Sequence, residues 1–276
     1  MFLFNVKILS CQSCAVDSYI DFSLYDKNAN GHIEVDELQI MFIVGGGEFA
    51  AGDNASTSVH AHQFSFDPPP SHDGVTIMSY SNNGTYSVFG EKHGTHFATI
   101  GIIAHELGHA RWGLPDLYDR DDSSFGIGYF GLMSFGSWGK TFEDDFAGET
   151  PTHICAYGKE DLGWGIPTLI TESQNNILMH ASHNLNHNII KIPTSDDNIY
   201  TLIENRSPKG YDAGLYTMEN TPFQGGIAIW HIDKNQITFQ NDDETQKLVD
   251  LVEANDPELD NEISGGRRTN LFSASF

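Results

Sequence analysis

The chain has 276 residues, enough to bury the core of one large domain or of two closely packed halves. Its formal charge is −24, from 38 acidic and 14 basic residues, which disfavours binding to nucleic acid or to anionic membranes. No apolar run approaches the roughly 18 residues that a membrane helix needs. Hydrophobic residues make up 39% of the chain, so we expect a soluble globular protein and not a disordered one.

The first residues do not form a convincing secretory signal. Residues 1–6 are apolar, but Lys7 interrupts the run and no basic segment precedes it. Cys11 and Cys14 form a CxxC pair, which by itself indicates neither a zinc ribbon nor a redox site. Residues 1–15 therefore predict a strand or a disordered end.

A calcium-loop pattern follows a short predicted helix at residues 16–25. It reads Asp26-x-Asn28-x-Asn30-Gly31-x5-Glu37, with oxygen donors at the required spacing and a glycine at the sharp turn. Because residues 38–44 predict a strand ended by three glycines, we expect an isolated loop and not a paired EF-hand. The alternative is an Asn- and Gly-rich turn that needs no metal. The predicted calcium ligands are Asp26, Asn28, Asn30, His32 and Glu37.

The clearest helix is predicted over residues 95–112. Ile100, Ile103, Ala104 and Leu107 recur on one helical face, and Gly113 and Pro115 end the pattern. Before it, residues 51–74 predict a loop and residues 75–80 a strand.

This helix carries the sequence His105-Glu106-Leu107-Gly108-His109. Two histidines four residues apart project from one helical face, which suits two ligands of a tetrahedral zinc ion. Zinc lowers the pKa of a bound water to about 7, and a carboxylate at Glu106 can take its proton. The alternative is a surface helix that happens to carry two histidines.

A third ligand is expected soon after the helix. Gly113 allows the chain to turn sharply, and Asp116 then supplies a short carboxylate that completes a His-His-Asp set. Further on, in an irregular stretch at residues 120–150, Met133 lies in Gly-Leu-Met-Ser. At this spacing residues 131–135 predict the methionine turn of the metzincin plan, against the alternative of an ordinary core methionine.

The second half of the chain predicts mostly β structure. A second helix is expected at 153–162, and residues 241–276 predict an acidic, loop-rich end. The predicted strands are 176–181, 188–192, 199–204 and 226–232. We therefore expect an α+β fold: a zincin-like or metzincin-like catalytic core at residues 1–165 and a β-rich part at 166–276 packed on it.

Five segments together resemble the immune inhibitor A family of secreted bacterial metallopeptidases. Their order along the chain is the order found in that family, and they lie within residues 20–260. The segments are HELGHARWGLPDLYD at 105–119, GIGYFGLMSFGSWG at 126–139, PTHICAYGKEDLGW at 151–164, LIENRSPKGYDAGL at 202–215 and GGIAIWHID at 225–233.

The resemblance implies a catalytic zinc ion, structural calcium, secretion to the extracellular space and a removable pro-segment. It assigns His105 and His109 as zinc ligands and Glu106 as general base. One departure concerns the third ligand: the family has two residues between the second histidine and the glycine, whereas three separate His109 from Gly113 here. Asp116 is our choice, with Asp119 as the competing candidate. The matching region also begins almost at the first residue, which suggests an N-terminally truncated chain.

The sequence thus predicts a zinc-dependent endopeptidase that acts on protein or peptide substrates, as a monomer, without nucleic-acid or membrane partners. One alternative is a non-catalytic calcium- and zinc-binding adhesion or matrix protein, although such a protein has no need of Glu106. The others are a different zinc hydrolase such as an amidase, which the methionine turn disfavours, and an inactive peptidase fragment.

Overall fold

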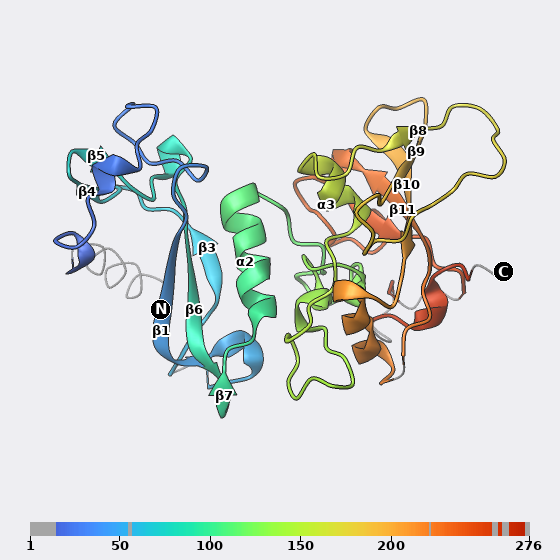
Figure 1. Ribbon diagram of the computed structural model, residues 1–276, viewed down its shortest axis with the longest axis horizontal. Helices are drawn as coiled ribbons and strands as arrows, with labels where there is room; N and C mark the ends of the chain where they lie inside the picture. The colour runs from blue at the N-terminus through green and yellow to red at the C-terminus, as the bar shows by residue number, and fades with distance from the viewer. Residues whose placement is uncertain (1–14, 55–56, 221, 256–258, 261–264, 274–276) are drawn as a thin grey trace. The chain divides into compact units, whose positions relative to one another are not determined.

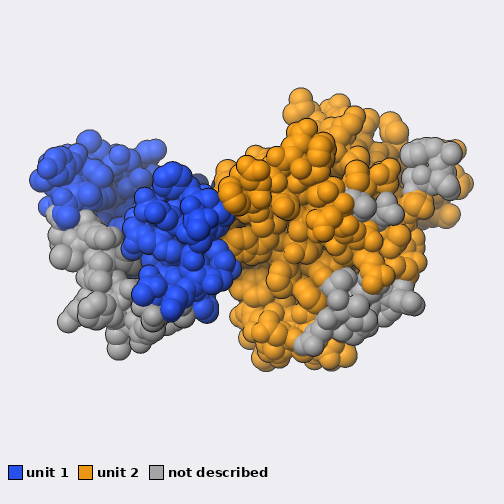
Figure 2. All heavy atoms as spheres, turned by 90° about the horizontal axis from the view of Figure 1, so that it is seen from below, with its two compact units in different colours: residues 1–98, 106–113 blue, residues 99–105, 114–276 orange. Residues whose placement is uncertain are grey.

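The computed structural model describes residues 15–54, 57–220, 222–255, 259–260 and 265–273 (Figure 1). Helices and strands are mixed along the chain, as predicted for an α+β fold. The chain forms two compact units, coloured separately in Figure 2: unit 1 comprises residues 1–98 and 106–113, and unit 2 comprises 99–105 and 114–276. No helix among the described residues is long and apolar enough to cross a membrane. The predictions for residues 1–14, including the Cys11–Cys14 pair, lie outside the described residues.

Unit 1 contains a five-stranded sheet in the order β2-β1-β6-β3, with β7 added to β6. Strand β1 is parallel to β2 and β6, and β3 pairs antiparallel with β6 at the edge of the sheet. The strands are β1 (Ile40–Glu48), β2 (Ser58–Val59), β3 (His62–Phe64), β6 (Tyr86–His93) and β7 (His96–Phe97). Apolar residues such as Phe22, Ile33 and Ile77 form the core of this unit.

Strand β1 does not stop at the glycines, so the predicted strand end was wrong. The strand continues through residues 45–47 to Glu48. A Cβ atom on Gly90 of β6 would lie 2.6 Å from the carbonyl oxygen of Gly47, so the backbones pass too closely for a side chain. The glycines here allow strand contact and do not end the strand.

The segments around this sheet contain shorter elements than predicted. Within residues 75–80 the strand is confined to β5 (Val75–Thr76), which pairs with β4 (Ser71–His72) inside the region predicted as loop. Short 3-10 turns complete unit 1: η1 (Phe22–Leu24) within the predicted helix at 16–25, η2 (Phe49–Ala51) and η3 (Tyr80–Asn82).

Helix α2 (Ile100–Trp112) begins later than the predicted residue 95. The reason is the hairpin of β6 and β7, in which His93 pairs with His96 and Lys92 with Phe97. The helix ends as predicted: Gly113 has φ +67°, and its N–H donates to the carbonyl oxygen of His109 over 2.9 Å.

Unit 2 contains a second five-stranded sheet in the order β12-β11-β10-β9-β8. Neighbouring strands are antiparallel except β8 and β9, which are parallel. The strands are β8 (Thr168–Leu169), β9 (Ile190–Pro193), β10 (Ile199–Arg206), β11 (Gly226–Asp233) and β12 (Val249–Leu251). Helix α3 (Ala156–Asp161) contacts β10 and β11, and the core of this unit includes Leu202 and Trp230, both fully buried.

The predicted strands at 188–192, 199–204 and 226–232 correspond to β9, β10 and β11. Residues 176–181 form no strand; within them only Ala181 makes an isolated bridge, to Asn205. Strands β8 and β12 were not predicted. The remaining 3-10 helices of unit 2 are η4 (Gly128–Phe130), η5 (Phe135–Trp138), η6 (Gly210–Met218), η7 (Lys234–Gln236) and η8 (Arg268–Asn270).

The compact units divide the chain elsewhere than at residue 165. The segment with Met133 and the strands after residue 165 belong to unit 2, where they share one hydrophobic core. The reason is that Met133, Phe130 and Leu117 are buried together with residues of β10 and β11, such as Leu202 and Trp230.

Candidate metal centre

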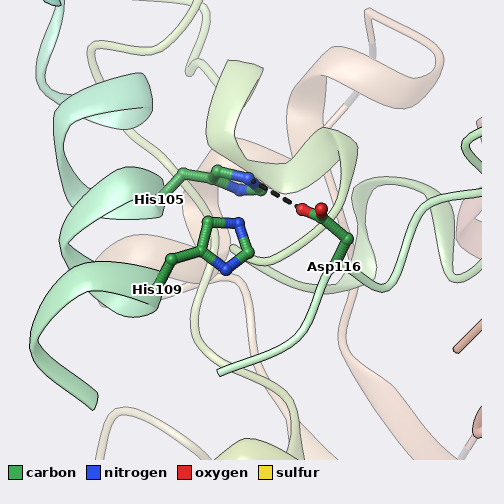
Figure 3. A group of neighbouring side chains, drawn as sticks. All are labelled: His105, His109 and Asp116. Atoms are coloured by element: carbon green, nitrogen blue, oxygen red, sulfur yellow. Dashed lines mark ion pairs between the residues drawn. The ribbon is translucent and has the colours of Figure 1, made fainter. Parts of the chain in front are cut away.

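Helix α2 presents both histidines on one side. His105 and His109 are one helical turn apart, and Figure 3 shows their rings extending from α2 toward Asp116. His105 and Glu106 are buried, with 5% and 7% of their surfaces exposed, and His109 is half-buried. The predicted ligands and base are thus held by a rigid element.

Asp116 reaches the histidines because the residues around it are fixed. Leu114 and Leu117 are both buried, and the N–H of Leu117 donates to the carbonyl oxygen of Met133 over 2.7 Å. Between these two leucines the Asp116 carboxylate lies 3.2 Å from Nε2 of His105 (Figure 3).

The three side chains form a set of possible metal ligands. Their ligand atoms all lie within 4.8 Å of one another. Ligand atoms on one zinc ion are separated by up to about 4 Å, so small side-chain adjustments would close the set around an ion. Within the part of the chain that the structure describes, this is the one group of three or more His, Cys, Asp or Glu residues with such spacing.

The hydrogen bonds of His105 support a cation in this set. Its Nδ1 lies 3.0 Å from the carbonyl oxygen of Leu132, an acceptor that requires Nδ1–H. A neutral imidazole has only one N–H, so its Nε2 lone pair then faces the Asp116 carboxylate. Two electron-rich groups at 3.2 Å are stable only with a proton or a metal ion between them. A divalent cation held by His105, His109 and Asp116 would meet this requirement.

The Leu132 carbonyl belongs to the predicted methionine turn. Residues 132–134 form a turn, η5 follows at Phe135, and the Met133 side chain is buried in the core of unit 2. Leu132 donates its N–H to the carbonyl oxygen of His153 over 3.2 Å. The contact from Leu132 to His105 is made by a backbone atom, so residue types in the sequence gave no direct signal for it.

A buried ion pair supports the same backbone segment. Arg206 and Asp212 are fully buried and joined by two hydrogen bonds, and Arg206 also donates to the carbonyl oxygen of Phe130 over 2.7 Å. Asp212 accepts a hydrogen bond from the N–H of His153. Burial opposes ionisation of Asp212, but the Arg206 guanidinium outweighs burial and lowers the pKa of the carboxyl.

Asp119, the competing third ligand, is placed outside the group. Its side chain is buried, and its oxygens accept hydrogen bonds from the N–H of Asp121 and from the hydroxyl of Ser123. Burial works against its ionisation, yet these hydrogen bonds, Ser123 first, lower its pKa. Asp119 thus organises the loop after the helix.

The predicted calcium loop is closed by its own side chains. Asp26 accepts hydrogen bonds from the N–H groups of Asn30 and Gly31, and Glu37 accepts them from Lys27 and Asn28. These bonds would organise the loop with or without a calcium ion, so calcium binding stays a prediction. The ring of His32 contacts the Thr76 hydroxyl over 2.6 Å, so any ligand from this residue would be its backbone carbonyl.

Glu34 is an acidic residue of this loop that is absent from the predicted calcium ligands. Its carboxylate accepts hydrogen bonds from the amide groups of Asn28 and Asn30. Glu34 occupies the ninth position of the loop pattern, where calcium loops place a ligand or a water. Its position in the sequence pattern could therefore have identified it as a candidate ligand.

Helix α2 thus places the buried carboxylate of Glu106 beside the His-His-Asp group in a chain of mixed helix and strand. The sequence model of a family described as "Immune inhibitor A peptidase M6, catalytic domain" matches residues 10–165, more than half of the chain. The chain belongs to this family of metallopeptidases. No curated protein matches the chain.

Proposed function

We propose that this chain is a zinc-dependent endopeptidase with His105, His109 and Asp116 as zinc ligands and Glu106 as general base. The observation that carries the proposal is the Nε2 of His105, which faces Asp116 while Nδ1 faces the Leu132 carbonyl. Such an outer-shell acceptor fixes the tautomer of a metal-binding histidine and strengthens it as a ligand. The arrangement of helix, turn and ligands fits a zincin of the metzincin kind, with Met133 in the methionine turn.

Bound zinc would supply Lewis acidity, which polarises the scissile carbonyl and lowers the pKa of water. Glu106 would accept the proton of the water as its oxygen attacks the peptide carbon. The same carboxyl would then give that proton to the amine nitrogen as the C–N bond breaks. Because the proton passes from water to the leaving amine, Glu106 ends the cycle ionised, as it began. Burial of Glu106 limits competing hydration of its carboxylate.

The principal test replaces Glu106 with glutamine, which keeps the shape of the side chain and removes its basicity. Glu106→Gln should retain one zinc per chain and lose nearly all cleavage of casein, by a factor of about 100 or more. Glu143→Gln, at an exposed position of unit 2, is the matched control and should cleave as the wild type does. Chelator should abolish cleavage in both active proteins.

The result separates the peptidase from a non-catalytic zinc-binding protein. Zinc bound by a wild-type chain that cleaves no denatured protein would support the adhesion or matrix alternative. Substantial activity in Glu106→Gln would contradict the role of this carboxylate as the base.

Structural calcium at residues 26–37 and an extracellular location remain parts of the proposal. The pattern Asp26-x-Asn28-x-Asn30-Gly31-x5-Glu37, with oxygen donors at calcium-loop spacing, supports the calcium part of the proposal. Calcium should raise the melting temperature of the wild type, and Asp26→Asn combined with Glu37→Gln should remove that effect. An equal response of both proteins would contradict a calcium ion in this loop.

A further inference from the structure

A groove of about 500 Å³ lies within unit 1 next to one predicted zinc ligand. Its walls are the end of β3, the region around η3 and the last turn of α2 from His109 to Gly113. The hydroxyl of Thr85 donates to the carbonyl oxygen of Ala110 over 2.7 Å, which fixes the helix end against the opposite wall. His109 both lines the groove and belongs to the His-His-Asp group.

Three aromatic side chains in this groove are exposed to solvent. Phe64 at the end of β3 is 52% exposed, Tyr80 in η3 78% and Trp112 at the end of α2 40%. Pockets that bind ligands combine apolar and aromatic walls with few polar groups. A bulky apolar side chain bound against these walls would remove their exposed apolar surface from water, which is favourable.

Arg111 is the only Arg, Lys, Asp or Glu among the residues that line the groove. It makes no ion pair with any described residue, although acidic residues outnumber basic ones by 38 to 14. The helix end carries about half a negative charge, which one guanidinium outweighs. The groove therefore presents a cation that is available to a carboxylate.

We propose that this groove is a substrate subsite that selects a bulky apolar residue with an acidic residue beside it. The apolar side chain lies against Phe64, Tyr80 and Trp112, and the neighbouring carboxylate pairs with Arg111. Binding energy from such a subsite accelerates cleavage when it positions the scissile bond. The inference rests on the proposed peptidase function, because it takes the occupant to be the peptide that is cleaved.

The test uses quenched fluorescent peptides that share one cleavable core. Flanking positions carry Phe or Ala, each next to Asp, Asn or Lys, and kcat/KM is measured for each peptide. Tyr80→Ala should reduce the preference for Phe over Ala about tenfold. Arg111→Glu should reduce the preference for Asp and increase cleavage of the Lys peptides by a similar factor. Tyr19→Ala and Lys92→Glu, at exposed positions of the same unit, are the matched controls.

Unchanged preferences in both groove variants would overturn the subsite. A second measurement separates this result from failure of the peptidase function. The Glu106→Gln chain should bind the Phe-Asp peptide by fluorescence anisotropy, and adding Tyr80→Ala or Arg111→Glu should weaken binding about tenfold. Peptide binding with these dependences in a wild type that cleaves nothing would support the groove and refute the peptidase. Absence of selective binding would refute the groove whatever the activity.

Discussion

Nδ1 of His105 lies 3.0 Å from the carbonyl oxygen of Leu132, the residue immediately before Met133. The contact links helix α2 to the turn and directs Nε2 toward Asp116. A backbone acceptor cannot be removed by exchanging a side chain, so the orientation of His105 depends on where residues 130–133 lie. Contacts that fix this segment therefore act on the metal centre indirectly.

Replacing Asp116 or Asp119, the two candidate third ligands, by alanine should change zinc affinity by different amounts. Asp116→Ala removes a carboxylate from the His-His-Asp group, so zinc affinity should fall by more than the roughly 10- to 100-fold that loss of an outer-shell partner costs. Asp119→Ala removes an acceptor from the loop after the helix and should leave zinc affinity within about tenfold of the wild type. Competition with a fluorescent zinc chelator measures both constants.

Urea unfolding of the same two variants after metal removal provides the control. Asp119→Ala should lower the free energy of unfolding, because it leaves two donors of the loop without their acceptor. Full zinc affinity in Asp116→Ala together with lost affinity in Asp119→Ala would reverse our assignment.

Removal of Arg206 should destabilise the fold strongly. Arg206→Met leaves the Asp212 carboxylate buried without its cation, and breaking one partner of a buried pair costs about 3–5 kcal/mol. Arg120→Met breaks the pair with Asp242, where the arginine side chain is 41% exposed, and such pairs contribute about 0–1 kcal/mol. Chemical unfolding with metal removed measures both changes in the free energy of unfolding. Similar decreases in the two variants would contradict the difference in burial between the two ion pairs.

Helix α2 could be predicted because its signals are local. The spacing of His105 and His109 and the stop at Gly113 lie within nine residues, and the structure places them as expected. The choice between Asp116 and Asp119 could not be made locally. It depends on where Leu114 and Leu117 are buried, and those contacts come from residues far along the chain.

Strand β6 shows that the fold, too, depends on contacts that the local sequence does not reveal. It was not predicted, although its first five residues are buried in the middle of the sheet between β1 and β3. Ser87 and Gly90 interrupt any apolar pattern, and their positions are explained only by neighbouring strands. Gly90 lies against Gly47, more than 40 residues earlier in the sequence, and its N–H donates to the buried carboxylate of Glu48.

The thiol of Cys155 should be unreactive while the protein is folded. Burial raises its pKa to about 11, and thiol reagents attack the thiolate. In a Cys11→Ser, Cys14→Ser background Cys155 is the only cysteine of the chain. At pH 8 its modification by a chromogenic disulfide should be roughly 100-fold slower than in 6 M guanidinium chloride. Equal rates in the two solutions would show that the residue is accessible.

Acid should weaken the folded state through His153. Burial is the main cause that lowers the pKa of this imidazole to about 4, below the usual 6.5 of an unfolded chain. Between these values the unfolded chain binds more protons than the folded one, so stability rises with pH. The contribution of neutral His153 is fully present above pH 6.5 and is lost as the pH falls toward 4. The loss approaches about 3 kcal/mol below pH 4.

Urea unfolding at pH 4 to 8 tests this dependence with metal removed, so that loss of zinc does not add to it. His153→Gln cannot gain a proton in this range, so its stability should fall less steeply than that of the wild type as the solution becomes acidic. Below pH 6.5 the free energy of unfolding of the variant should therefore rise relative to that of the wild type. Above pH 6.5 the difference between the two free energies should be constant. A variant that keeps the full wild-type slope would show that His153 is hydrated in the folded protein and titrates there as it does in the unfolded chain.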